Sequence, residues 1–192
     1  MSHLRQCFNH SRKRSVMSDS TDTPKPPRPI VSSEHLASEH GWQMSELEYG
    51  LIIAFNGFSR WMVRCMNAAG HQDFNPLDVL VLHNVNHRNR EKRLNDICFV
   101  LNVEDPHTVN YSLKKLIKAK LVKGTKRGKE IFYSPTEQGE EACSEYRKIR
   151  ELCLIDPAVS TDSKSDEISH TAQVLRSISG LYDQASRAAA SL

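Results

Sequence analysis

The segment from residue 105 to residue 129 constrains the fold more than any other part of the chain. Asp105 can cap a helix, and Pro106 suits the first helical position, where its missing N–H group costs nothing. Three apolar residues then recur at spacings of four and three, which predicts a helix with one buried stripe: Val109, Leu113 and Leu116. Residues 106–129 include eight lysines and arginines and no acid, although the whole chain has a net charge of only +3. A helix with an apolar inner face and a basic outer face is suited to a groove of DNA.

The polar side chains of this helix are expected to face away from the buried stripe, with Asn110 on its flank. They are the candidate contacts to bases and phosphates: His107, Thr108, Asn110, Tyr111, Lys114 and Lys118. A row of lysines near the end of a helix also favours the helix dipole and can be only a solvated face. The pattern alone therefore leaves both interpretations open.

A β-hairpin is predicted at about residues 122–134, directly after the basic helix. The sequence alternates on both sides of a turn placed at Arg127–Gly128, with β-branched and aromatic residues on the second strand. The tip of the hairpin carries Lys126, Arg127 and Lys129. A basic hairpin in this place predicts a wing that inserts an arginine into the minor groove.

Two helices are expected before the basic one. Asn75–Pro76 begins a helix that is apolar on most sides, and the polar residues 83–91 are expected to form the loop after it. Residues 93–101 form a shorter helix, and Asn102 suits the left-handed turn that follows. Two short helices joined by a tight turn, the second one basic, predict a helix-turn-helix at about 93–118.

Long amphipathic helices are predicted on either side of this core. Ser45 and Glu48 form a capping box for a helix over 45–69, and residues 136–190 contain two more helices, the first capped by Thr136. The apolar faces of 45–69 and 165–190 exceed what a small core can cover, so we expect a homodimer. Residues 1–43 are rich in proline and form a flexible basic arm, either a phosphate contact or only a soluble tail.

The first long helix contains an unusual density of aromatic and sulfur side chains. They are Phe55, Phe58, Trp61 and Met62, and Phe74 follows the helix. Such a stripe is either plain core packing or the wall of a pocket for a small apolar or aromatic effector. Both interpretations stay open at this stage.

Several other classes of protein receive no support from the sequence. No run of 18 apolar residues could span a membrane, residues 1–29 lack the apolar core of a signal peptide, and no phosphate loop or nucleophile elbow occurs. No enzyme, cofactor or metal site is therefore expected; His71, His83 and His87 lack a further ligand at clear spacing.

The five cysteines contain no C-x-x-C pair, which favours a reducing cytoplasm. Cys65, Cys98 and Cys143 are expected to be buried, which leaves Cys7 and Cys153 for redox sensing.

The order of these elements and their motifs closely resemble the MarR (multiple antibiotic resistance regulator) family over about residues 45–190. The resemblance lies in the phrase from Leu94 to Val122, with Thr108-Val109 early in the basic helix, Leu121-Val122 after it, and Thr136-x-x-Gly139 after the hairpin. It implies a mainly α winged helix-turn-helix, with a three-helix core, a two-stranded β-wing and long dimerisation helices, over residues 44–192.

The implied function is that of a bacterial, cytoplasmic, homodimeric transcription regulator that binds near-palindromic double-stranded DNA and responds to a small molecule. Architectural or non-specific nucleic-acid binding, redox sensing and a protein-interaction scaffold are the alternatives. The family's wing commonly carries an Asp-x-Arg motif, which is absent here, so Arg127 is expected to be less rigidly held. Lys120 replaces the family's usual glycine before the Leu-Val pair.

Overall fold

The structure is a computed structural model that describes residues 41–157 and 165–192. The chain divides after Gly50, inside its first helix, into two units, and all sites discussed below belong to the second unit, Leu51–Leu192. The predicted basic arm and Cys7 lie outside the described residues, apart from the last three residues of the arm. In the described ranges, no helix combines the length and the apolar character needed to cross a membrane.

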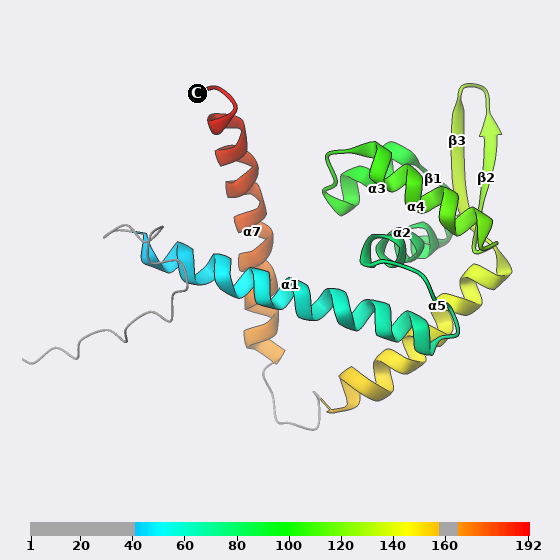
Figure 1. The fold of residues 1–192 in the computed structure, drawn as a ribbon, viewed down its shortest axis with the longest axis horizontal. Helices are drawn as coiled ribbons and strands as arrows, with labels where there is room; N and C mark the ends of the chain where they lie inside the picture. The colour runs from blue at the N-terminus through cyan, green and yellow to red at the C-terminus, as the bar shows by residue number, and fades with distance from the viewer. Residues whose placement is uncertain (1–40, 158–164) are drawn as a thin grey trace, which may run out of the picture. The chain divides into compact units, whose positions relative to one another are not determined.

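The described residues form a mainly helical winged helix-turn-helix, as predicted (Figure 1). The elements follow in the order α1 (Trp42–Ala68), α2 (Pro76–Asn86), η2 (His87–Asn89), β1 (Lys92–Arg93), α3 (Leu94–Leu101), α4 (Pro106–Lys118), β2 (Val122–Arg127), β3 (Glu130–Pro135), α5 (Glu137–Arg150), the π-helix η3 (Glu151–Ile155) and α7 (Ser165–Ala189).

Local capping signals fix the boundaries of the central helices. Asn75 caps α2, and its side chain and that of Asp78 each accept a hydrogen bond from the other's backbone N–H, both at 2.9 Å. The side chain of Asp105 caps α4 by accepting from the N–H of His107 at 2.9 Å. Asn102 ends α3 with φ +51°, in the left-handed conformation that the sequence predicted.

Three of the predicted boundaries are wrong. The first helix begins at Trp42, so Ser45 lies inside it and does not cap it. The second helix continues through His83 to Asn86, because apolar residues on its inner face remain in the core for another turn. The hairpin turn is one residue later than predicted: Arg127 pairs with Glu130, and the loop consists of Gly128, at φ +62°, and Lys129.

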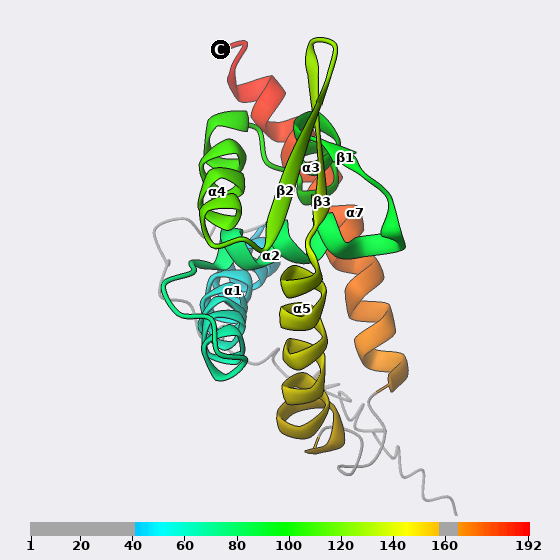
Figure 2. The ribbon, with the colours of Figure 1, turned by 90° about the vertical axis from the view of Figure 1, so that its right-hand side faces the viewer.

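The wing contains a strand that the sequence did not reveal. Strands β2 and β3 form the predicted antiparallel hairpin, and the two-residue strand β1 pairs with the other edge of β3, in the order β1-β3-β2. In both ribbon views the tip of the hairpin projects past α3 and α4 (Figures 1 and 2). β1 is too short for a periodic signal, so only its pairing with β3 defines it.

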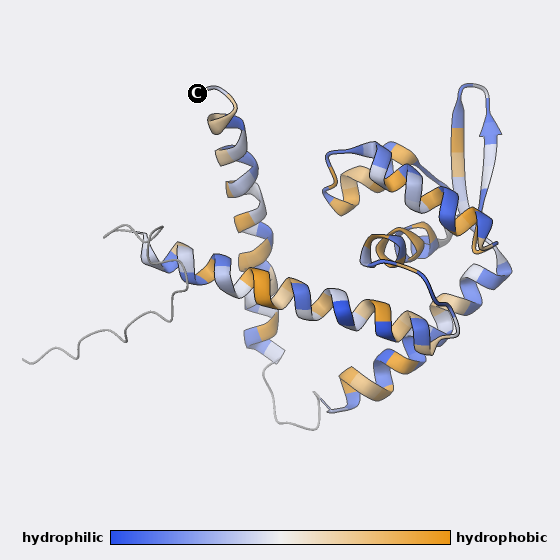
Figure 3. Cartoon of the chain, in the orientation of Figure 1, coloured by the Kyte–Doolittle hydropathy of each residue, from blue (hydrophilic) through white to orange (hydrophobic). Residues whose placement is uncertain are grey.

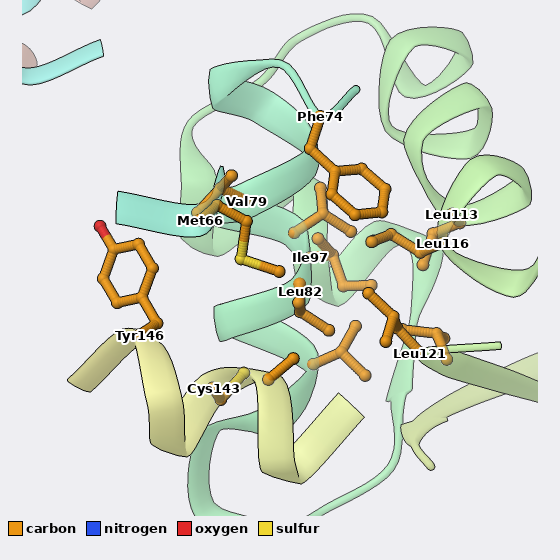
Figure 4. Packing of buried hydrophobic residues seen from close by; sticks show 14 of the residues in the cluster. Met66, Phe74, Val79, Leu82, Ile97, Leu113, Leu116, Leu121, Cys143 and Tyr146 are labelled. Carbon is orange, nitrogen blue, oxygen red and sulfur yellow. The ribbon is translucent and has the colours of Figure 1, made fainter. Parts of the chain in front are cut away.

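The hydrophobic core surrounds α2, which packs against α3, α4, α5 and β3. Val79 and Leu82 of α2 belong to one buried cluster with Leu113 and Leu116 of α4, the stripe that the sequence predicted (Figure 4). Met62, Cys65 and Met66, from the last turns of α1, complete the core on the side of α5.

Long parts of α1 and most of α7 are exposed in the part of the chain that the structure describes. Apolar residues recur along both helices (Figure 3), but Ile52 and Phe55 are 58% and 62% exposed, and no residue of α7 is buried. The predicted excess of apolar surface on the terminal helices is therefore present.

Candidate nucleic-acid interface

The outer face of α4 presents the polar side chains that the sequence assigned to DNA. His107, Thr108, Tyr111, Lys114 and Lys118 are exposed, and Asn110 is half-buried. The Thr108 hydroxyl donates to the carbonyl of Asp105 at 2.8 Å, so it also stabilises the first turn. The opposite face is buried, which gives α4 the apolar inner and basic outer surfaces of a recognition helix.

Lys115 contributes less to this basic face than the other lysines of α4, because its side chain forms an ion pair with Asp78 of α2. Its Nζ donates to Oδ2 of Asp78 at 2.8 Å and lies 5.4 Å from the centre of the Phe74 ring. The Asp78 side chain is completely buried, whereas that of Lys115 is 30% exposed. One charge of the basic segment therefore connects α4 to α2.

The tip of the wing carries a second basic surface, formed by Lys126, Arg127 and Lys129, which are all exposed. Arg127 is held more firmly than the sequence predicted. Its Nη1 and Nη2 contact the two carboxylate oxygens of Glu91 at 2.8 and 3.0 Å, and its Cζ lies 5.2 Å from the centre of the Phe132 ring. The expectation of a loosely held arginine is wrong because the carboxylate comes from the chain before β1.

Glu91 was missed because it lies 36 residues before its partner. In the sequence it is the only acid among the basic residues 87–93, which is a weak signal. The same loop adds exposed basic side chains that sequence reasoning also left out, Arg88, Arg90 and Arg93, of which Arg93 contacts Glu130 of the wing.

The connection between α4 and α5 explains two of the family-like motifs. Lys120 has φ +60°, the left-handed conformation that favours the glycine usual in the family at this place. Thr136 caps α5 by accepting from the N–H of Gly139 at 3.1 Å, and its hydroxyl donates to the carbonyl of Lys120 at 2.6 Å. A Cβ on Gly139 would lie 2.0 Å from the carbonyl oxygen of Leu121, so only glycine fits.

A cavity of about 640 Å³ opens where α1, α2 and α5 meet. It is lined by Phe58, Trp61 and Met62, three of the residues that the sequence offered as the wall of an effector pocket, together with Arg147 and Arg150 of α5. The other two predicted pocket residues do not line it. Phe55 is exposed on α1, and Phe74 is buried in the core beside Lys115.

His83 contributes a buried polar group to this cavity. Its Nε2 is buried without a hydrogen-bond partner, and its ring contacts that of Tyr146 edge-on at 4.4 Å between centroids. Burial lowers the pKa of His83 and raises the pKa of Tyr146 to about 12, so both side chains are neutral near pH 7.

The thiols of the core are buried, as the sequence predicted. Cys65, Cys98 and Cys143 are buried, and burial raises the pKa of each, to about 11 for Cys143. Cys153 is exposed. Within residues 41–157 and 165–192, no three histidine, cysteine or acidic side chains are grouped so that they could hold a metal ion.

Comparisons with known proteins agree with this geometry. Residues 74–139 match the winged helix DNA-binding domain family. The fold is similar to that of a mutant MarR from E. coli in complex with operator DNA, at 14% identity and a TM-score of 0.59 over 73% of this chain and 99% of that chain. Staphylococcus aureus MarR in complex with salicylate and kanamycin gives 14% identity and a TM-score of 0.58, over 74% and 94%. A MarR transcriptional regulator from Methanosarcina mazei gives 15% and 0.58, over 71% and 96%. No curated protein sequence matches the chain.

The matched segment, residues 74–139, contains α2, the helix-turn-helix and the wing, so this part of the chain is a winged helix DNA-binding domain. Over about three quarters of the chain, the fold is similar to that of solved MarR proteins, which confirms the fold that the resemblance in the sequence implied.

Proposed function

We propose that the protein is a cytoplasmic, homodimeric transcription regulator that binds a specific near-palindromic operator and is released from it by a small molecule. The observation that carries the proposal is the shared exposure of the polar face of α4 and the basic tip of the wing in a winged helix domain. Solved structures of this fold include a MarR protein bound to operator DNA.

Base recognition is assigned to the first turns of α4. His107, Thr108, Asn110 and Tyr111 can donate to or accept from base edges in the major groove. Phosphates are assigned to Lys114 and Lys118 on α4 and to Lys126 and Lys129 on the wing, and the minor groove to Arg127.

Alanine variants separate these two roles. Asn110→Ala or His107→Ala should cost about 1–3 kcal/mol at particular base pairs and relax the preference there. Lys118→Ala should weaken binding to every sequence. It should also reduce the salt slope, which is the slope of log affinity against log salt concentration, by about one per half-site. Lys148→Ala, the same change on α5, serves as the control. The assignment is wrong if neither His107→Ala nor Asn110→Ala alters sequence preference.

Dimerisation is assigned to the exposed apolar faces of α1 and α7. Ile52 and Phe55 on α1 are more than half exposed, and Leu175 and Leu181 on α7 are 40% and 50% exposed. A second copy of the chain would cover these side chains and present two recognition helices to half-sites about one DNA turn apart. Equilibrium sedimentation should show a dimer that Leu175→Glu with Leu181→Glu dissociates; a monomer at micromolar concentration would contradict the proposal.

The effector is assigned to the cavity between α1, α2 and α5. Its aromatic wall fits an apolar or aromatic molecule, and Arg147 and Arg150 fit an acidic group on that molecule. One solved structure of this fold contains salicylate and kanamycin.

Trp61 lines the cavity and reports on its occupancy. Titration with phenolic or aromatic acids should change Trp61 fluorescence and lower operator affinity about 5–150-fold, the range for 1–3 kcal/mol of coupling. Phe58→Ala should weaken the response. If compounds that release DNA leave Trp61 fluorescence unchanged, the effector binds elsewhere.

Architectural binding predicts a different result. A regulator should bind its operator much more tightly than random duplex of equal length, whereas an architectural protein should bind both alike. A scaffold protein would show no steep salt dependence, because it would release no counterions from DNA.

A further inference from the structure

The hairpin itself contains no acid that positions Arg127. β2 and the loop residues Gly128 and Lys129 carry no carboxylate. Glu130 begins β3, but its Oε1 accepts from Nη1 of Arg93 at 3.2 Å. A carboxylate that orients Arg127 therefore has to come from outside the hairpin.

Glu91 supplies this carboxylate in a two-point contact. Its two oxygens meet the two terminal nitrogens of Arg127 at 2.8 and 3.0 Å, and the Phe132 ring lies beside the guanidinium. A bidentate carboxylate and an aromatic ring together restrict the orientation of a planar guanidinium. Arginine has five N–H donors, so the remaining donors stay free for DNA.

The next residue, Lys92, fixes the position of Glu91. Lys92 pairs with Tyr133 of β3, and its side chain is buried although it is charged. Its Nζ donates to three backbone carbonyls at 3.4, 2.6 and 3.3 Å, those of Val85, His87 and Arg90. The loop before β1 is thus tied to the end of α2, and Glu91 cannot move far from the wing.

We propose that Glu91 is a positioning residue for DNA recognition. It holds the Arg127 guanidinium in place in the free protein, so that the wing inserts an ordered arginine into a narrow, AT-rich minor groove. This inference rests on the proposed function, which assigns Arg127 to the minor groove.

Removal of Glu91 should have two opposite effects. Loss of a negative charge beside the wing strengthens binding to any DNA, because DNA is a polyanion. Loss of the contact to Arg127 increases the entropy that the arginine gives up on binding, and this weakens only the complexes in which it enters the groove. If the role of Glu91 were purely electrostatic, its removal would change the affinity for all DNA sequences by the same factor.

The test compares the preference of each variant for A/T flanks over G/C flanks, because this ratio of two affinities cancels the general effect of charge. The full chain first selects its tightest duplex from a random pool. Fluorescence anisotropy then measures affinity for that duplex with A/T flanks and with G/C flanks. Glu91→Gln should lower the ratio of the two affinities about threefold to fivefold, the upper range for one exposed ion pair.

A matched control separates position from charge. Glu130→Gln also removes one negative charge, at the first residue of β3, but the partner of Glu130 is Arg93, so the ratio should stay at the wild-type value. Adding Thr125→Asp to Glu91→Gln should restore the ratio. Residues 125 and 127 lie on one face of β2, since side chains alternate along a strand.

The outcomes distinguish this inference from the proposed function. If Arg127→Ala lowers the ratio but Glu91→Gln does not, or if Glu130→Gln lowers it equally, the inference is overturned and the proposed function stands. If the wild type shows no preference for A/T flanks, or Arg127→Ala keeps it, the minor-groove contact fails and the inference with it. Should Glu91→Gln not fold, Glu91→Asp, whose shorter side chain cannot reach both nitrogens, takes its place with the same expected loss.

Discussion

The ion pair between Lys115 and Asp78 should matter for stability and hardly at all for DNA affinity. Asp78 is completely buried; its Oδ2 accepts from Lys115 at 2.8 Å and from the Asn75 N–H at 2.9 Å, while its Oδ1 has no hydrogen-bond partner. Lys115 is the only charged partner that this carboxylate has among the described ion pairs. Lys115→Met removes that partner and leaves a buried, uncompensated charge.

The size of the effect follows from burial. Removal of one partner from a fully buried ion pair costs about 3–5 kcal/mol. Lys115 is 30% exposed, so water can partly replace its ammonium, and we expect a loss at the lower end, about 2–3 kcal/mol. That is a large share of the roughly 5–15 kcal/mol that stabilises a typical domain.

A double-mutant cycle measured by urea unfolding tests this reasoning. Asp78→Leu combined with Lys115→Met should be more stable than Lys115→Met alone, because the apolar pair leaves no buried charge. All variants are compared at one protein concentration, since the proposed dimer makes stability concentration-dependent.

The DNA measurement provides the second half of the test. Lys115→Met should keep the wild-type salt slope under conditions where it is folded, whereas Lys118→Ala should reduce it by about one per half-site. The reasoning is refuted if Lys115→Met is as stable as the wild type and flattens the salt slope as Lys118→Ala does.

Four further changes have defined outcomes. Lys120→Gly should raise the free energy of unfolding by up to about 1 kcal/mol, since glycine accepts φ +60° without strain. A variant that urea unfolding shows to be less stable than the wild type would contradict this. Gly139→Ala should cost at least ~2 kcal/mol in the same assay, because its Cβ would overlap the Leu121 carbonyl. Burial lowers the pKa of His83 below 6.5, so its contribution to stability is complete above that pH and is lost as the pH falls below it; His83→Phe should remove this part of the pH dependence of unfolding. Thr136→Val should leave ligand binding at Trp61 intact but reduce ligand-driven operator release; unchanged release would show that α5 does not transmit the signal.

Local signals account for the parts of the fold that the sequence predicted. The caps at Asn75, Asp105 and Thr136 and the left-handed turn at Asn102 each depend on residues no more than four positions apart. The stripe of α4 depends only on helical periodicity. Such features can be recognised without knowledge of the fold, and the structure shows each of them.

The missed features depend on contacts between distant parts of the chain. Lys115 finds Asp78 37 residues away, and Arg127 finds Glu91 36 residues away. Strand β1 exists only through its pairing with β3. The sequence does not reveal that Lys115 forms an ion pair with a buried carboxylate or that Arg127 is held by Glu91, because both contacts depend on the fold.

Helix α5 connects the two sites that the proposed function requires. At its start, Thr136 and Gly139 contact the backbone of Lys120 and Leu121, the residues that follow the recognition helix. One to three turns later, the same helix lines the cavity with Cys143, Arg147 and Arg150. The close contact at Gly139 leaves no space for α5 to slide independently of Leu121, because packed backbone is not compressible. A ligand that binds one orientation of α5 better than another therefore also selects an orientation of α4, and this differential affinity is what release from DNA requires.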